Sequence, residues 1–238
     1  LISCKNNKLE SFNGMRLLKH EKEEASLNIK NSDEIKFYHI SDYRNLIVVK
    51  KELCPAELGF PPHEYVGKDI DYILKDIKEI KVLNKFVEEN KFEIIGRTYM
   101  FYPWGVSEIS KLPAFKSIHN KSALCVCNAD IVKGIAKAMK IDLAYLKNST
   151  GDTNTDLYEK SKAVIEGIKD YDTVIAHING TDEISHRKDL RGKIEFIEKI
   201  DREFIKEIYD NIENIKYDIR IIMVSDHQTS TITGRHEK

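Results

Sequence analysis

From about Lys121 onward, short apolar segments alternate with longer amphipathic ones, and this alternation constrains the fold more than any other feature. The segments at 123–127 and 173–177 have the length and apolar composition of buried strands. Further strands are predicted at 142–146 and 219–224, and helices at 131–139, 157–169 and 190–212. Strands that alternate with helices form a parallel sheet wrapped by helices, so the sequence predicts an α/β fold.

Carboxylates and imidazoles gather in two short clusters near the end of the chain. Asp182 and His186 follow one predicted strand, and Asp226 and His227 directly follow another, with His236 a few residues further on. Side chains four residues apart on a helix share one face, so the first pair can close on one ion. Neighbours on an extended segment point in opposite directions and suit two adjacent ions. Because parallel sheets bind ligands beyond the carboxyl ends of their strands, a site for two metal ions is predicted there.

Each cluster alone has an ordinary structural explanation. Asp182 and His186 fit a helix cap with a surface histidine, and Asp226 with His227 fits a turn at a strand end. Together with His236, and at the ends of strands that flank one helix, the set favours metal ligation. A mixture of carboxylate and imidazole suits Mn²⁺, Mg²⁺ or Zn²⁺ and does not choose among these divalent ions.

The first hundred residues have a different organisation. Strands are predicted at 37–39 and 45–50, and an amphipathic helix at 69–90. The extended segment at 92–102 then ends at Pro103-Trp-Gly105. We therefore expect a first domain over residues 1–105 and a second over 106–238.

Composition excludes several classes of function. With 38 basic against 39 acidic residues, the chain has no net positive charge for binding nucleic acid or an anionic membrane. No apolar run approaches the roughly 20 residues that span a bilayer, and no secretory signal is visible. The four cysteines are too few and scattered for a disulfide framework, so a cytoplasmic location is expected. Since the chain begins at Leu1 and ends soon after His236, we expect it to be part of a longer protein.

Several motifs occur in the same order as in a known family. They include Thr181-Asp-Glu-Ile-Ser-His186, Ser225-Asp-His-Gln-Thr229, Gly234-Arg-His236, Pro61-Pro-His-Glu64 and Tyr43-Arg44. In these motifs, and in others along nearly its whole length, the chain resembles the cofactor-independent phosphoglycerate mutases of the archaeal type, which belong to the alkaline phosphatase superfamily. The resemblance implies an alkaline-phosphatase-like parallel sheet core, flanked by helices, into which a smaller α/β lid domain is inserted. Residues 1–105 would then be part of the lid, and residues 106–238 the C-terminal half of the core.

The family uses two divalent metal ions and a serine that is transiently phosphorylated. The resemblance implies that Asp182, His186 and His236 hold one ion, and that Asp226 and His227 hold the other. The family's nucleophilic serine and a further metal-binding aspartate lie in an N-terminal segment that nothing in this chain matches. No catalytic nucleophile is therefore expected within these residues, and the chain by itself should be inert unless the segment is supplied.

Three residues are candidates for substrate binding. Arg44 is the first, because a guanidinium group matches the geometry of phosphate, although an exposed arginine at a strand edge would look the same. His63 lies in a loop stiffened by two prolines, and a surface histidine there is the alternative. Lys162 follows the loop around Thr150 and can reach substrate, or it is a solvated helix residue.

The implied function is interconversion of 2- and 3-phosphoglycerate in glycolysis. Departures from the family pattern leave alternatives open: Ser185 and Arg187 replace small residues, residues 106–108 lack the usual glycine and basic residue, and Glu237 replaces a hydroxyl residue. One alternative is a related phosphotransferase or phosphatase acting on another metabolite, for example a homoserine kinase. Another is a non-catalytic remnant of the fold. The native metal and the formation of an oligomer also stay open.

Overall fold

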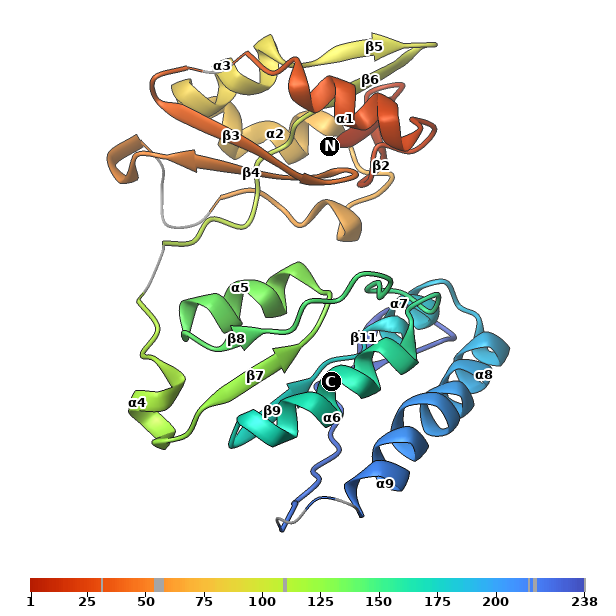
Figure 1. Cartoon of the computed structure of the whole chain (residues 1–238). Coiled ribbons are helices and arrows are strands. Elements are labelled where there is room, and N and C mark those ends of the chain that lie inside the picture. The colour runs from red at the N-terminus through yellow and green to blue at the C-terminus, as the bar shows by residue number, and fades with distance from the viewer. Residues whose placement is uncertain (31, 54–57, 109–110, 214, 216–217, 238) are drawn as a thin grey trace. The chain divides into compact units, whose positions relative to one another are not determined.

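The computed structural model describes residues 1–30, 32–53, 58–108, 111–213, 215 and 218–237. The chain divides into two compact units, Leu1–Ile109 and Ser110–Lys238 (Figure 1). Each unit has hydrophobic residues buried in a core of its own. None of the described helices has the length and apolar character needed to cross a membrane. The role of the first unit as an inserted lid stays a prediction.

The first unit is built on an antiparallel sheet. Its strands are β1 (Ile2–Lys5), β2 (Lys8–Ser11), β3 (Ile35–Ser41), β4 (Arg44–Val49), β5 (Phe92–Ile94) and β6 (Arg97–Met100), and its helices are α1 (Lys19–Leu27), α2 (Ile70–Glu79) and α3 (Lys81–Glu89), with 3₁₀ turns at Lys51–Leu53 and Pro62–Glu64. One sheet has the order β2-β1-β6-β5, and β3 pairs with β4 in a separate hairpin. The strands predicted at 37–39 and 45–50 are thus both present. The first is longer than predicted, and the second begins and ends one residue earlier.

The helix predicted at 69–90 is two helices. Asp69 caps α2 by accepting the backbone N–H of Asp71 at 2.8 Å, and Ile80 then adopts an extended conformation between α2 and α3. The change of direction at Ile80 lets both helices bury their apolar faces in one core, where Ile73 and Leu83 have no exposed surface.

The second unit has a parallel sheet covered by helices. Its strands are β7 (Ala123–Val126), β8 (Asp142–Leu143), β9 (Thr173–Ala176), β10 (Gln228–Thr229) and β11 (His236–Glu237), and its helices are α4 (Phe115–His119), α5 (Asp130–Ala138), α6 (Leu157–Asp170), α7 (Gly180–His186), α8 (Leu190–Ile200) and α9 (Lys206–Ile212). β7 lies between β8 and β9 and is parallel to both. All of β7 is buried, as a central parallel strand requires. The predicted α/β class, with a parallel sheet flanked by helices, is confirmed.

The predicted helix at 190–212 contains a π-helical turn. Residues Asp201–Ile205 form this turn between α8 and α9, where the backbone N–H of Lys206 donates to the carbonyl of Asp201. A π turn is wider than an α-helical turn. Phe196 of α8 and Phe204 of the π turn are buried, whereas Ile194 of α8 is half exposed.

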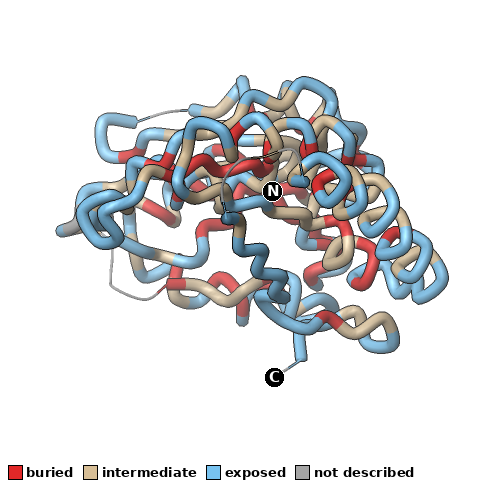
Figure 2. The backbone as a smooth tube through the Cα atoms, turned by 60° about the horizontal axis from the view of Figure 1, so that its bottom comes forward, coloured by how far each residue is buried: buried red, intermediate tan, exposed pale blue. Residues whose placement is uncertain are grey.

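The prediction of a strand at 219–224 is wrong for this structure. These residues form no strand, and the side chains of Ile222 and Val224 are 75% and 84% exposed. The chain close to its C-terminus is accordingly coloured mostly as exposed in Figure 2. A strand exists only when a neighbour pairs with its backbone, and no described segment does so at these residues.

Candidate metal centre

The first part of the site is a short helix that begins just after β9. Gly180 starts α7, and a Cβ atom there would lie 2.5 Å from the ring of Phe196, so only glycine lets the helix approach this closely. Asp182 lies in the first turn and His186 in the last. Their spacing brings His186 Nε2 to 3.3 Å from Asp182 Oδ1, as predicted for an i, i+4 pair.

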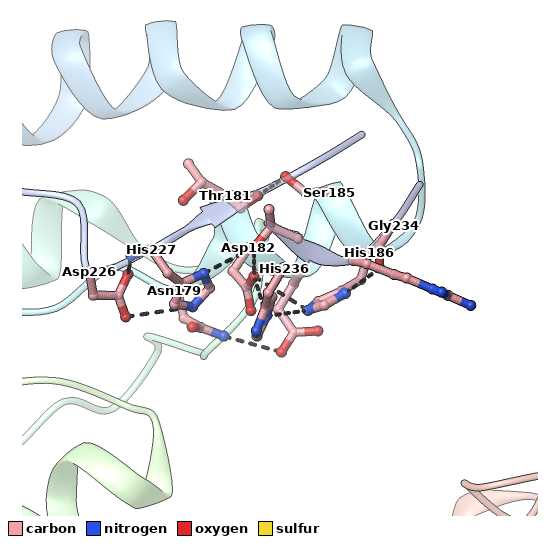
Figure 3. Close-up of polar contacts among 12 residues, drawn as sticks. Asn179, Thr181, Asp182, Ser185, His186, Asp226, His227, Gly234 and His236 are labelled. Carbon is pink, nitrogen blue, oxygen red and sulfur yellow. Dashed lines mark hydrogen bonds and ion pairs between the residues drawn. The ribbon is translucent and has the colours of Figure 1, made fainter. Parts of the chain in front are cut away.

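The third member of the cluster comes from the end of the chain. β10 pairs with β11 in antiparallel fashion, with Thr229 opposite His236. This pairing places His236 Nε2 at 3.4 Å from Asp182 Oδ1 and 3.1 Å from His186 Nε2. Figure 3 shows the three side chains turned toward one another. The ligand atoms of all three lie within 4.8 Å of one another, close enough to hold one metal ion.

The orientation of His186 fits a metal ligand. Its Nδ1 lies 2.9 Å from the carbonyl oxygen of Gly234, which only accepts, so Nδ1 carries the proton. With the Nδ1 proton donated to Gly234, Nε2 faces the space between Asp182 and His236, where a metal ion would bind. Donor atoms about 2.0–2.1 Å from one tetrahedral metal lie about 3.3–3.4 Å apart. The observed separations of 3.1 to 3.4 Å match that spacing.

A buried threonine connects this cluster to the second predicted pair. Thr229 Oγ1 donates to Asp182 Oδ1 at 2.5 Å and lies 3.2 Å from His227 Nδ1. The rings of His227 and His236 are 4.1 Å apart between centroids. Asp226 accepts the backbone N–H of His227 at 3.0 Å, and its side chain is 77% exposed. The five predicted metal ligands thus lie close together in the structure. For a second metal ion, Asp226 and His227 supply only two ligand side chains.

The site opens into a cleft on the second unit. Its lining residues are Thr181, Asp182, Lys193, Ile197 and Ser225 to Thr229. Lys193 donates from Nζ to the carbonyl oxygen of Thr229 at 3.0 Å and brings positive charge to the wall of the cleft. Bound anions are stabilised by such a cation.

Two of the predicted substrate residues lie in the first unit, in one aromatic neighbourhood. Arg44 covers the ring of Tyr43 at 5.1 Å. Phe12 contacts both Tyr43 and His63 edge to face, with centroids 6.1 and 6.2 Å apart. His63 also lies 5.8 Å from Trp104. Arg44 and His63 are therefore linked through Phe12 and Tyr43, and their role in binding substrate stays a prediction.

The third predicted substrate residue, Lys162, is exposed on α6. Lys160, two residues earlier on the same helix, is buried instead, and the sequence pattern had not singled it out. One signal was available: Lys160 follows Leu157 by three residues and precedes Val164 by four. Both apolar residues are buried, and this spacing places Lys160 on their face of the helix.

A sequence model of the Metalloenzyme superfamily matches residues 9–237 of the chain. The chain belongs to this superfamily. The resemblance to the archaeal, cofactor-independent phosphoglycerate mutases is confirmed by proteins that are similar to this chain in sequence.

The 2,3-bisphosphoglycerate-independent phosphoglycerate mutase 1 of Methanocaldococcus jannaschii is 28% identical over 228 residues, which cover 88% of this chain and 54% of the relative. The corresponding mutase of Methanopyrus kandleri is 30% identical, over 85% of this chain and 52% of the relative. The PH0037 protein from Pyrococcus horikoshii has a similar fold, with a TM-score of 0.65 at 20% identity over 99% of this chain and 60% of that protein. The chain thus spans little more than half the length of these proteins.

Proposed function

We propose that the chain supplies the metal-binding part of a 2,3-bisphosphoglycerate-independent phosphoglycerate mutase, which interconverts 2- and 3-phosphoglycerate through a phosphoserine. The observation that carries the proposal is the cluster of Asp182, His186 and His236, with His227 beside it, in a chain that the superfamily model matches almost throughout. The serine nucleophile would come from polypeptide outside these 238 residues. A cytoplasmic, glycolytic role follows from the same proposal.

Two divalent ions would occupy the site. Asp182, His186 and His236 would hold one, and Asp226 and His227 would contribute to the other. When bound, such ions stabilise the attacking and leaving oxygens of a phosphoryl transfer and offset the charge of the transferring group. The donor set alone leaves the choice among Mn²⁺, Mg²⁺ and Zn²⁺ open.

Hydrogen bonds within the protein hold the proposed metal ligands in position before the ions bind. Gly234 orients His186 through its carbonyl oxygen, and Thr229 orients Asp182 and His227 through one hydroxyl. Such outer partners fix the direction of a ligand's lone pair and are needed for tight binding. Arg44 and His63 are proposed to bind the phosphate and carboxylate of the substrate, since cations match both groups.

The metal site is tested directly on this chain by titration with Mn²⁺ in a calorimeter. The wild type should bind, and Asp182→Ala should lose most of that affinity. Asp170→Ala, at an exposed position of α6, is the matched control and should bind as the wild type does. Equal Mn²⁺ affinity in all three proteins would contradict the ligand assignment.

The reaction is tested on the complete gene product, with 3-phosphoglycerate as substrate and formation of 2-phosphoglycerate as the readout. His227→Ala should abolish metal-dependent turnover and leave the far-ultraviolet circular dichroism spectrum unchanged. Turnover of homoserine with ATP, and none of 3-phosphoglycerate, would replace the mutase by a kinase of the same fold.

A further inference from the structure

Lys160 is a fully buried lysine in the first half of α6. Only 1% of its surface is exposed, and α6 packs against the parallel strands β7 and β9 (Figure 1). Within the described part of the chain, its ammonium group forms no ion pair with a carboxylate. The adjacent carboxylate of Glu159 instead accepts backbone N–H groups of Lys147 and Ser149 at 2.6 and 2.7 Å. A buried charge without a counter-charge is costly and calls for an explanation.

The ammonium group lies at the carboxyl ends of two neighbouring strands. Nζ of Lys160 donates to the carbonyl oxygen of His177, the first residue after β9, at 3.2 Å. The backbone N–H of His177 in turn donates to Val126, the last residue of β7, at 3.0 Å. In open parallel sheets this edge is where ligands bind.

Two other polar atoms at the same edge have no hydrogen-bond partner among the residues that the structure describes. They are Asn128 Oδ1 and His177 Nδ1, and both are buried. Buried polar atoms are nearly always paired, so unpaired ones mark a place built for something other than packing. The helix α7, which carries Asp182, begins four residues after the end of β9, so this edge of the sheet lies near the proposed metal ligands. Burial lowers the pKa of His177, and the charge of Asp226 opposes that shift.

Burial alone argues that Lys160 is unfavourable for folding. It lowers the pKa of Lys160 to about 8, against the opposing effects of Cys127 and Glu159 and with the support of Lys133. An apolar side chain of similar length would fill the same space without that cost. Groups whose pKa is shifted in this way concentrate at functional sites.

We infer that Lys160 is an electrostatic positioning residue, which fixes the end of β9 and supplies positive charge to the phosphate group of a ligand bound at the carboxyl edge of β7 and β9. The inference rests on the proposed function, since it names the anionic group that the metal site would face. It assigns Lys160, rather than the exposed Lys162, as the lysine of α6 that serves the site. No contact between Lys160 and the phosphate is required, because a buried charge acts over several ångströms in a medium of low dielectric constant.

The test compares wild type, Lys160→Met and a control, Lys169→Met, in which an exposed lysine at the end of the same helix is changed. Two quantities are measured on the chain by calorimetry: the affinity for Mn²⁺, and the affinity of the Mn²⁺-loaded protein for inorganic phosphate. Lys160→Met should bind phosphate at least about tenfold more weakly, and its Mn²⁺ affinity should not fall. Its melting temperature at pH 7 should equal or exceed that of the wild type, whereas a purely structural lysine would lower it on removal.

The pH dependence of phosphate affinity provides a second measurement, which reports the charge of Lys160 and not its packing. Phosphate affinity of the wild type should decline as pH rises through about 8, because the ammonium group of Lys160 loses its proton there. Lys160→Arg stays charged over this range and should not show the decline. The other titratable groups that face Lys160, namely Cys125, Cys127, Lys133, Glu159 and His177, are the same in both proteins.

The outcomes separate this inference from the proposed function. Failure of the wild type to bind Mn²⁺ would overturn the proposed function. Binding of Mn²⁺ with no phosphate affinity, or with equal phosphate affinity in wild type and Lys160→Met, would overturn the role of Lys160. A lower melting temperature with unchanged phosphate affinity would identify Lys160 as a structural residue only.

Discussion

Replacement of Thr229 by valine should weaken metal binding without removing a single metal ligand. Thr229 is 5% exposed, and its hydroxyl proton is directed to Asp182 Oδ1 at 2.5 Å. The hydroxyl oxygen then accepts from Nδ1 of His227 at 3.2 Å, which leaves Nε2 of His227 free to bind a metal. One hydroxyl therefore orients a ligand from each of the two predicted pairs.

Valine has nearly the same shape as threonine, so Thr229→Val removes the two hydrogen bonds and little else. Loss of an outer partner of this kind typically costs about 10- to 100-fold in metal affinity, or about 1.4–2.8 kcal/mol. The free energy of unfolding without metal should fall by about 1–3 kcal/mol, from two hydrogen bonds whose net value is typically about 0.5–1.5 kcal/mol each.

Mn²⁺ titration calorimetry gives the first quantity, and urea unfolding in the presence of a chelator gives the second. Thr229→Ser is the matched control, because serine keeps the hydroxyl and should retain affinity within about threefold of the wild type. Wild-type affinity in Thr229→Val would refute the argument. So would an equal loss in both variants, which would show that the methyl group matters and the hydroxyl does not.

Three further predictions concern the scaffold. Gly180→Ala should lower the free energy of unfolding by about 1–3 kcal/mol, since the added Cβ would lie 2.5 Å from the buried ring of Phe196; an unchanged urea midpoint would show that the ring moves freely. Hydrogen bonds from Arg187 lower the pKa of Asp152 to about 2. Stability from this pair should therefore be fully present above about pH 4 and be lost as pH falls toward 2. In acid titrations followed by circular dichroism, Asp152→Asn should lack that part of the transition, and an identical acid midpoint would contradict the assignment. Ile222→Lys should change the free energy of unfolding in urea by no more than about 0.5 kcal/mol, because the side chain is 75% exposed; a loss of several kcal/mol would show that residues 219–224 are buried after all.

The parallel sheet and its helices follow closely from local pattern. The apolar segments at 123–127 and 173–177 became β7 and β9, and the segment at 157–169 became α6. Periodicity reports which side of a segment is apolar, and this is enough to distinguish strand from helix when segments are long and regular. The i, i+4 spacing of Asp182 and His186 likewise predicts their proximity, since both lie on one helix.

Other features depend on neighbours that are distant in sequence. All of residues 219–224 except Arg220 are apolar, yet they form no strand, because a strand needs a pairing partner and periodicity does not supply one. The break at Ile80 and the π turn at Asp201–Ile205 arise from packing against the cores, and no local signal marks them.

The sequence by itself determined the residue types that can bind a metal and the elements that carry them. Only the tertiary structure decided which of them meet. The pairing of β10 with β11 brings His236 to His186, and Thr229 joins Asp182 to His227. Helical spacing already separates Lys160, on the buried face of α6, from the exposed Lys162, but only the packing of α6 on the sheet brings the ammonium group of Lys160 to the carbonyl oxygen of His177. The physical reason is the same in each case: the surroundings of a side chain are set by contacts between segments far apart in the chain, which no local pattern encodes.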